Sequence, residues 1–443
     1  MSGSRPAPET IAAWLPQQRW FGAKTKRISR VAIADAFPLG PGVVLLVDVE
    51  LEDGGAERYV VPVLAGVEIR DALDDVEFSR ALVTLIARAG SADGERGTIH
   101  GVPAAGLAER WPDGAPRDLA VRRIGGEQSN TSVVLGEAFM LKQFRKLAAG
   151  VNPEAEIPRF LTERTSFRNT PRLAGHLEYR EAGREATTLA VMQALVPDAV
   201  DGWQWVLARL KESNGTATVH ALRRLGERLG ELHHALASDP GDPVFAPEPI
   251  TAADVAAWTD AVADQLESAR RALRDTSLAV DSRAVHAGLA HLVGRQKIRH
   301  HGDFHLGQTL YRPSAADWMI IDFEGEPLRP LEERRRKHAA LRDVAGLLRS
   351  IDYAAASSAT TPAPWPAAAA REFAEGYRTA TGGASFLPRS DAAFDEAVAV
   401  FELEKAAYEI LYEANNRPTW IAIPQRGLAG ALARLQRAQL GAA

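Results

Sequence analysis

The hydrophobic pattern of this sequence changes near residue 200, and that change constrains the fold more than any other feature. Before it, runs of alternating or β-branched residues separated by tight turns predict strands at 31–63, 132–143 and 187–195. After it, apolar residues recur three and four positions apart, as in helices, and one strand-like island at 298–323 interrupts them. The predicted helices span 218–237, 252–294, 338–356, 366–381, 390–416 and 426–440. We therefore expect an α+β chain with two lobes, and ligands commonly bind in a cleft between lobes.

Composition excludes several kinds of protein and site. The 443 residues contain no cysteine, so disulfides, thiolate metal sites and cysteine nucleophiles are excluded. The 52 Lys and Arg against 57 Asp and Glu give a net charge of −5, which disfavours a general nucleic-acid binder. Neither a secretory signal nor an apolar run of about 18 residues is visible. We expect a cytoplasmic monomer that binds neither nucleic acid nor membranes.

The strand-like island carries the most informative polar residues. Its sequence over 301–327 is HGDFHLGQTLYRPSAADWMIIDFEGEP. Asp303 and Gln308 lie five residues apart in it, and Asp322 ends an apolar strand shortly before Glu324. A hairpin would bring these carboxylates and the amide oxygen together. Such a set suits Mg²⁺, which prefers one or two carboxylates and completes its shell with water and substrate phosphates.

The same residues predict separate roles in phosphoryl transfer. A carboxylate at the position of Asp303 orients an attacking hydroxyl and accepts its proton, whereas Gln308 and Asp322, with Glu324, would hold the metal against a nucleotide. Isolated acids of this kind are more often turn caps or surface residues. The order H-G-D-x₄-Q followed by I-D-F, however, resembles the catalytic and metal loops of the aminoglycoside-phosphotransferase-like kinases. Those relatives of the protein kinases usually have Asn where this chain has Gln308, which keeps a neutral oxygen ligand.

A kinase also requires a phosphate-binding turn, a strand lysine and a helix glutamate upstream. Lys142, in the strand-like sequence FMLK, is the candidate for the α- and β-phosphates, and Glu156 is preferred to Glu154 as its partner. The turn GGEQSNTS at 125–132 offers backbone N–H groups to phosphate, although a polar hairpin turn would look the same. The candidate nucleotide contacts are Ser129, Asn130, Thr131 and Ser132 in this turn, and the backbone of Gln193, Ala194, Leu195 and Val196 for adenine.

Several longer segments narrow the resemblance. They are WLPQQRWFGAK at 14–24, EQSNTSVVLG at 127–136, NPEAEI at 152–157, HGDFHLGQ at 301–308, IDFEGEPLRPLEER at 321–334, LRDVAGLLRS at 341–350 and YEILYEANNRPTW at 408–420. Together they resemble the bacterial maltokinases over nearly the whole chain. That resemblance implies a protein-kinase-like fold with a cap subdomain at 1–110, a β-rich N-lobe at 111–200 and a helical C-lobe at 201–443. It also implies ATP- and Mg²⁺-dependent formation of maltose 1-phosphate for α-glucan or glycogen synthesis.

One predicted helix and the segment after it offer candidates for the sugar site. Polar and aromatic side chains recur there at three- and four-residue steps, so much of the set shares one helix face. The candidates are Glu404, Tyr408, Glu409, Tyr412, Glu413, Asn416, Arg417 and Trp420, together with His305 near the attacking hydroxyl. An amphipathic surface helix with aromatic core contacts would give a similar pattern.

The candidate sugar site contains several carboxylates, so the sequence does not decide which sugar accepts the phosphoryl group. A protonated amine beside Glu409 or Glu413 would be favoured electrostatically, so glucosamine, giving glucosamine 6-phosphate, is the alternative to maltose. An aminoglycoside phosphotransferase and a non-catalytic pseudokinase are the remaining alternatives. The basic run at 334–337 is more simply explained as a solvated loop than as an anion or partner site.

Overall fold

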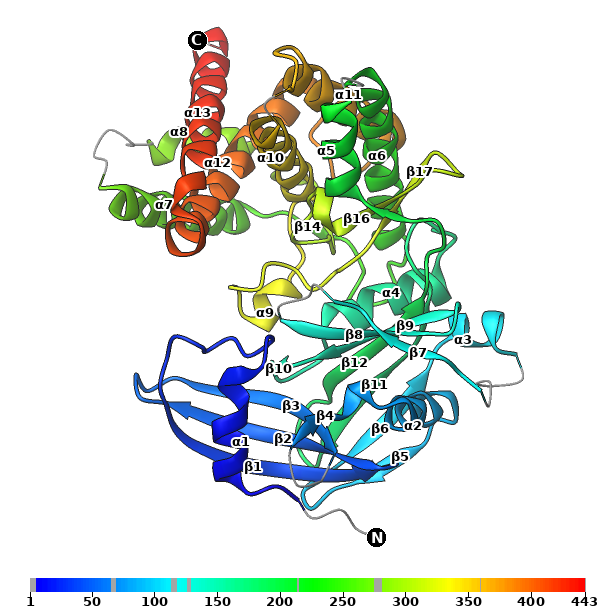
Figure 1. Ribbon diagram of the computed structural model, residues 1–443. Helices are drawn as coiled ribbons and strands as arrows, with labels where there is room; N and C mark the ends of the chain where they lie inside the picture. The colour runs from blue at the N-terminus through cyan, green and yellow to red at the C-terminus, as the bar shows by residue number, and fades with distance from the viewer. Residues whose placement is uncertain are drawn as a thin grey trace. The chain divides into compact units, whose positions relative to one another are not determined.

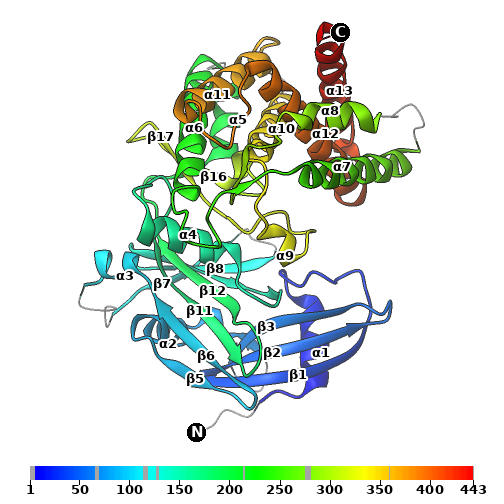
Figure 2. The same cartoon turned by 180° about the vertical axis from the view of Figure 1, so that it is seen from behind.

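The chain forms two compact units, Met1–Val196 and Pro197–Ala443. The computed structural model describes residues 5–64, 69–112, 118–125, 129–212, 215–274, 281–358 and 360–442. The first unit consists mainly of antiparallel sheets and the second mainly of helices (Figure 1), as the reverse view also shows (Figure 2). The α+β class expected from the sequence is confirmed. No helix in the described part of the chain is long and apolar enough to cross a membrane.

The N-terminal sheet contains the strand meander predicted at 31–63. Its strands are β1 (Ile28–Leu39), β2 (Gly42–Leu51), β3 (Ala56–Leu64), β10 (Lys146–Leu147) and β4 (Arg70–Asp71). The run Val43–Val47 of β2 is continuously apolar because both faces of the strand are covered there. Its residues Val43, Leu45 and Val47 pack with Ile11 of α1 (Pro8–Trp14), whereas Val44 and Leu46 face the cluster that contains α2 (Val76–Ala87). Successive strand side chains point to opposite faces, so each face is buried against a different helix.

A seven-stranded sheet forms the rest of the first unit. In spatial order its strands are β5 (Ser91–Asp93), β6 (Gly97–Pro103), β11 (Leu173–Glu181), β12 (Thr187–Ala194), β9 (Phe139–Phe144), β8 (Asn130–Leu135) and β7 (Val121–Arg123). α3 (Ala105–Arg110) and α4 (Pro153–Arg164) contact this sheet. α4 begins where the sequence Asn152-Pro153 predicts, because the Asn152 side chain accepts a hydrogen bond from the N–H of Glu154 at 2.9 Å.

The second unit is built from long helices around short strands. The helices are α5 (Gly202–Lys211), α6 (Gly215–Leu236), α7 (Ala252–Leu273), α8 (Ser282–Ala290), α9 (Leu331–Arg334), α10 (Leu341–Ser357), α11 (Trp365–Thr381), α12 (Asp391–Asn416) and α13 (Ala422–Ala442). α12 packs against α7, α8, α10 and α13, which lie near it in Figure 1. The prediction of one helix over 252–294 is wrong, because α7 ends at Leu273 and Arg274 adopts a left-handed φ of 54°. Such a residue terminates a helix.

Two glycines allow α6 and α11 to approach each other closely. A Cβ atom on Gly376 would lie 2.0 Å from the carbonyl oxygen of Arg223, and one on Gly226 would lie 2.0 Å from that of Phe373. We therefore expect Gly376→Ala to lower the free energy of unfolding by about 1–3 kcal/mol, the usual cost of overpacking. Gly430→Ala, whose Cβ would lie no closer than 3.8 Å to a neighbouring side chain, is the control and should not destabilise the protein. Denaturant unfolding of both variants measures the difference, and equal stability would contradict the packing described here.

Candidate functional site

A buried aspartate fixes the backbone of the loop that carries the HGD sequence. Asp343, near the start of α10, accepts hydrogen bonds from the N–H groups of His301 at 2.7 Å and Gly302 at 2.9 Å. Nε2 of His233, on α6, lies 3.0 Å from the same carboxylate. Burial alone would raise the pKa of Asp343, but the hydrogen bond from His233 and the neighbouring histidines hold that pKa well below its usual range. A charged carboxylate therefore orients the loop that presents Asp303.

The hairpin that follows this loop connects the predicted metal ligands. Its strands are β16 (Thr309–Arg312) and β17 (Asp317–Ile320). The carbonyl oxygen of Gln308 accepts a hydrogen bond at 3.0 Å from the N–H of Ile321, the residue before Asp322. Nε2 of His301 lies 2.9 Å from the carbonyl oxygen of Ile321. These contacts hold the backbone of Gln308 next to the residue before Asp322. The side chain of His301 connects the HGD loop to that same residue.

Asp322 adopts a backbone conformation that is rare outside glycine. Its φ of 65° lies in the left-handed region, and such residues are often found at functional sites. The amide oxygen of Gln308 and the carboxylate of Asp322 are the kinds of ligand that Mg²⁺ prefers. Within the described residues, no group of three or more His, Asp and Glu could hold a metal ion by itself. The chemistry of this donor set, with Glu324 two positions beyond, would suit a Mg²⁺ ion that takes further ligands from phosphate and water.

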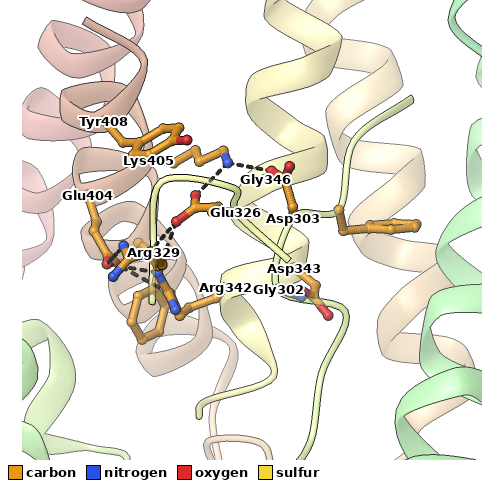
Figure 3. A pocket seen from close by; sticks show the side chains of 12 residues that line it. Gly302, Asp303, Glu326, Arg329, Arg342, Asp343, Gly346, Glu404, Lys405 and Tyr408 are labelled. Atoms are coloured by element: carbon orange, nitrogen blue, oxygen red, sulfur yellow. Dashed lines mark hydrogen bonds and ion pairs between the residues drawn. The ribbon is translucent and has the colours of Figure 1, made fainter. Parts of the chain in front are cut away.

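Lys405, on α12, forms an ion pair with the predicted catalytic carboxylate of Asp303. The sequence did not predict this ion pair. Nζ of Lys405 lies 2.8 Å from Oδ1 of Asp303 and 2.6 Å from Oε1 of Glu326 (Figure 3). The side chains of Lys405 and Asp303 are each 15% exposed, and that of Glu326 is 3% exposed. Burial would lower the pKa of Lys405, but the two carboxylates raise this pKa above its ordinary value. Asp303 therefore lies beside a positive charge that is shielded from water.

Two arginines bind the carboxylates on the far side of Lys405. Arg329 contacts both Glu326 and Glu404, and Arg342 lies 2.9 Å from Glu404 (Figure 3). Glu404 is only 7% exposed. Its carboxylate is therefore engaged in buried ion pairs. This placement argues against the predicted contact between Glu404 and the sugar. Glu404 instead holds Arg329 and Arg342 in position beside the site.

A cavity of about 370 Å³ opens beside Asp303, a size typical of small-molecule sites. Seven of the predicted acceptor residues line it, and they are His305, Tyr408, Glu409, Tyr412, Glu413, Arg417 and Trp420. Asn416 does not line it, and its side-chain amide donates a hydrogen bond to the carbonyl of Tyr412 at 2.8 Å. The aromatic side chains of Trp203 and Tyr353 complete the wall. The cavity thus joins the predicted catalytic carboxylate to most of the predicted acceptor residues.

Two glutamates in this cavity are oriented by arginines. Glu409 pairs with Arg349 at 2.9 Å, and burial raises the pKa of Glu409 despite the nearby guanidinium. Glu413 pairs with Arg417 at 2.6 Å and accepts a hydrogen bond from the hydroxyl of Tyr353 at 3.2 Å. Carboxylates held in this way need little reordering to accept hydrogen bonds from a polar ligand.

Comparison with known proteins places the chain in a family. Residues 14–98 match the maltokinase N-terminal cap domain. The chain is 30% identical over 402 residues to a glucosamine kinase from Streptacidiphilus jiangxiensis, covering 84% of this chain and 85% of that protein. It belongs to the cap-bearing, aminoglycoside-phosphotransferase-like kinases. A glucosamine kinase from Mycolicibacterium smegmatis is 29% identical over 326 residues, covering 69% of this chain and 78% of that protein.

Solved structures of this kinase family have the same fold. A glucosamine kinase in complex with glucosamine, ADP and inorganic phosphate matches with a TM-score of 0.68 and 24% identity, covering 96% of this chain and 99% of that one. The expected kinase-like fold with an N-terminal cap is therefore confirmed. The relatives named here are glucosamine kinases, and they do not support the narrower assignment to the maltokinases.

The nucleotide contacts predicted from the kinase resemblance lie on β8, β9 and β12 of the first unit or next to the ends of these strands. Lys142 lies opposite Ser132 in the neighbouring strand and is 8% exposed. Directly opposed strand residues point to the same face, so Ser132 and, two positions earlier, Asn130 share a face with Lys142. Thr131 points to the other face, where its hydroxyl accepts a hydrogen bond from Arg145 at 2.8 Å. This argues against Thr131 as a phosphate contact. Ser129 precedes β8, and residues 126–128 of the predicted turn lie outside the described part of the chain.

The two glutamates considered as partners of Lys142 differ in burial. Glu154, on α4, is 2% exposed and accepts a hydrogen bond from the side chain of Gln193 at 3.0 Å. Glu156 is partly exposed. The choice of Glu156 stays a prediction, and the burial of Glu154 keeps that residue as an equal candidate.

Two backbone donors of the predicted adenine-binding segment already have partners within the first unit. The N–H groups of Ala194 and Leu195 donate hydrogen bonds at 2.8 Å to the carbonyls of Arg172 and Ala138. These donors are used within the first unit, so adenine recognition would fall to carbonyl groups of the segment and to the backbone of Val196.

Sequence reasoning missed the charged residues that surround Asp303. Glu326, Arg329 and Arg342 follow Asp303 by 23, 26 and 39 residues, and Lys405 is 102 residues from Asp303. One signal was present, because Lys405 is the only lysine or arginine in the otherwise acidic segment Asp391–Asn416. A single cation in a buried acidic helix requires a carboxylate partner.

Proposed function

We propose that this kinase transfers the γ-phosphoryl group of ATP to the 6-hydroxyl of glucosamine. The observation that carries the proposal is a single cavity lined both by Asp303 and by the oriented glutamates Glu409 and Glu413. A hydroxyl near Asp303 and an amine near one of the glutamates would be placed by a single sugar ring. The aromatic side chains of the wall suit the apolar faces of that ring.

The chain's own residues would act in the following way. The acceptor oxygen forms a bond to the γ-phosphorus, its proton passes to Asp303, and the bond to the ADP leaving group breaks. When bound, Mg²⁺ supplies charge neutralisation, and Gln308 and Asp322, with Glu324 nearby, are the residues that would hold it. Lys142, supported by Glu154 or Glu156, would bind the α- and β-phosphates. Lys405 would hold the carboxylate of Asp303 in position.

Charge favours an amino sugar over a neutral sugar in this cavity. Three carboxylates, those of Asp303, Glu409 and Glu413, line it together with Lys405 and Arg417, and Arg349, which does not line the cavity, pairs with Glu409. A protonated amine would therefore gain charge-assisted hydrogen bonds, whereas maltose would gain neutral ones. The two relatives named above are glucosamine kinases, which supports the same choice.

Maltose remains a second candidate because residues 14–98 match a cap domain described from maltokinases. An assay of ADP release with glucosamine, glucose and maltose, followed by identification of the product, separates the two candidates. We expect glucosamine 6-phosphate, with glucose a much poorer acceptor. Turnover of maltose without turnover of glucosamine would refute the proposed substrate and leave the kinase assignment intact.

Removing one carboxylate from the cavity should affect glucosamine selectively. We expect Glu409→Gln to raise the KM for glucosamine about 10- to 100-fold, because one charge-assisted hydrogen bond contributes about 1.5–3 kcal/mol. The KM for glucose should change little, since glucose carries no amine. Asp391→Asn, which removes an exposed carboxylate from the first turn of the same helix, is the matched control. Equal increases for both sugars would argue against recognition of the amine by Glu409.

A further inference from the structure

A second cavity in the helical unit plays no part in the proposed reaction. It encloses about 560 Å³, and none of Asp303, Gln308 and Asp322 lines it. Its walls come from α7, the segments around Lys297 and His338, and the basic run at 334–337. Seven lysine and arginine side chains line it against four carboxylates, an excess of three positive charges. That excess is concentrated in one place, although the chain as a whole has a net charge of −5.

The lysines of this cavity are held by carboxylates that an anion could replace. Lys297 lies 2.8 Å from Asp254 and 3.7 Å from Glu248. Lys337 lies 2.6 Å from the same Glu248. The side chains of Lys297 and Lys337 are 19% and 8% exposed, so both ammonium groups are already positioned and largely desolvated. A preorganised cationic wall binds an anion at a lower entropic cost than mobile surface lysines would.

His300 gives independent evidence for a ligand. Its side chain lines the cavity and is only 6% exposed, yet neither ring nitrogen has a hydrogen-bond partner among the described residues. Burial lowers its pKa to about 3, so the neutral ring offers one N–H donor and one acceptor at neutral pH. A buried polar group without a partner is costly, and few are left so in folded proteins. An occupant of the cavity would satisfy the N–H group.

We propose that this cavity binds a small free polyanion of the phosphate type, with Lys297, Lys337 and His300 among its contacts. An excess of three positive charges calls for more than the single negative charge of a monocarboxylate. Arginine and lysine side chains match phosphate oxygens in charge and hydrogen-bonding capacity. The basic run at 334–337, which the sequence alone suggested was a solvated loop, thereby becomes part of a binding site.

The proposed anion site shares residues with the ion pairs beside Asp303. Arg329 and Arg342 line both this cavity and the smaller pocket around Asp303. Both arginines contact Glu404, and Arg329 also contacts Glu326, which binds Lys405. An anion in the cavity would compete with Glu404 for the same guanidinium groups.

Calorimetric titration of the full chain with inorganic pyrophosphate tests the proposal. The titration is made without divalent cations, first with no nucleotide and then with saturating ADP to fill the nucleotide site. We expect one pyrophosphate per chain in the presence of ADP. Lys297→Met should weaken this binding about tenfold, the effect of about 1.4 kcal/mol, because it removes one charged contact. Glu248→Gln should strengthen it, because that change removes a carboxylate that lies within 3.7 Å of both lysines and would repel the anion.

Arg371→Met is the matched control, because it removes one exposed positive charge from α11 and should bind pyrophosphate as the wild type does. Absence of binding in the presence of ADP would overturn the proposal. So would Lys297→Met and Glu248→Gln variants that bind pyrophosphate as the control does. Because the two substitutions are expected to act in opposite directions, a general loss of folding cannot imitate the predicted result. The titration measures no turnover, so it is independent of the proposed substrate.

Discussion

Asp303→Asn is expected to lower kcat with glucosamine by about 10²–10⁴-fold, the range for loss of a general base. Asparagine keeps the size of the side chain and one oxygen that can accept a hydrogen bond from Lys405, but it cannot take the proton of the acceptor hydroxyl. The affinity for ADP should stay within about twofold, because Asp303 is not among the residues proposed to hold the nucleotide. Steady-state kinetics and an ADP titration of the same preparation provide both values.

The control for this variant is again Asp391→Asn, which removes a carboxylate that is 85% exposed at the start of α12. It should retain wild-type kcat. An Asp303→Asn enzyme with nearly normal kcat would show that another group accepts the proton. A large loss of ADP affinity would instead indicate that Asp303 acts through the nucleotide.

Lys405→Met is expected to reduce both stability and activity. The substitution keeps the apolar stem and removes the ammonium group from between Asp303 and Glu326, whose side chains are 15% and 3% exposed. Breaking a buried ion pair by removing one partner costs about 3–5 kcal/mol. Denaturant unfolding measures this loss. In the kinetic assay, kcat should fall, because the carboxylate of Asp303 loses the ammonium group that holds it in position.

A double variant separates the two effects of Lys405. Lys405→Met with Glu326→Gln leaves one buried negative charge fewer than Lys405→Met alone, so part of the lost stability should return. Activity should not return, because Asp303 still lacks its cation. Recovery of full activity together with stability would mean that Lys405 serves only to maintain the fold.

The sequence predicted those parts of the site whose residues are close together in the chain. The HGD loop and the IDF strand lie within 25 residues of each other, and a hairpin is the shortest connection between them. The residues that hold this loop come from other elements. Asp343 is 42 residues from His301, and Lys405 is 102 residues from Asp303, so no local spacing indicates either contact.

The periodicity of the sequence predicted which side chains share one face of a helix or strand. It did not predict which residues of other elements those side chains contact. The three- and four-residue steps on α12 correctly grouped Tyr408, Glu409, Tyr412 and Glu413 along one cavity. Glu404, one turn earlier on the same helix, instead meets Arg329 and Arg342, because that turn packs beside other segments. In the first unit, strand side chains alternate between faces, so Thr131 points away from the face that Asn130 and Ser132 share. The sequence prediction treated the polar residues of the turn as one group and did not make this distinction.

The fold followed the sequence pattern where that pattern was long and regular. The meander at 31–63 and the α+β class are confirmed, whereas the break between α7 and α8 was missed because the apolar spacing continues across it. α5 was also missed. Its ten residues lie against η3 (Leu306–Gln308) and β16, and tertiary contacts of this kind stabilise short helices that propensity alone does not reveal.

The central claim is that one cavity places the acceptor hydroxyl at Asp303 and the acceptor amine at the glutamates of α12. A crystal structure of Asp303→Asn with ADP, Mg²⁺ and glucosamine tests it most directly, since ADP has no γ-phosphoryl group to donate and the sugar stays unreacted. The account predicts a sugar hydroxyl within about 3 Å of the residue 303 side chain and the amine on the carboxylate of Glu409 or Glu413. Glucosamine bound elsewhere, or bound with its amine turned away from both glutamates, would contradict the account.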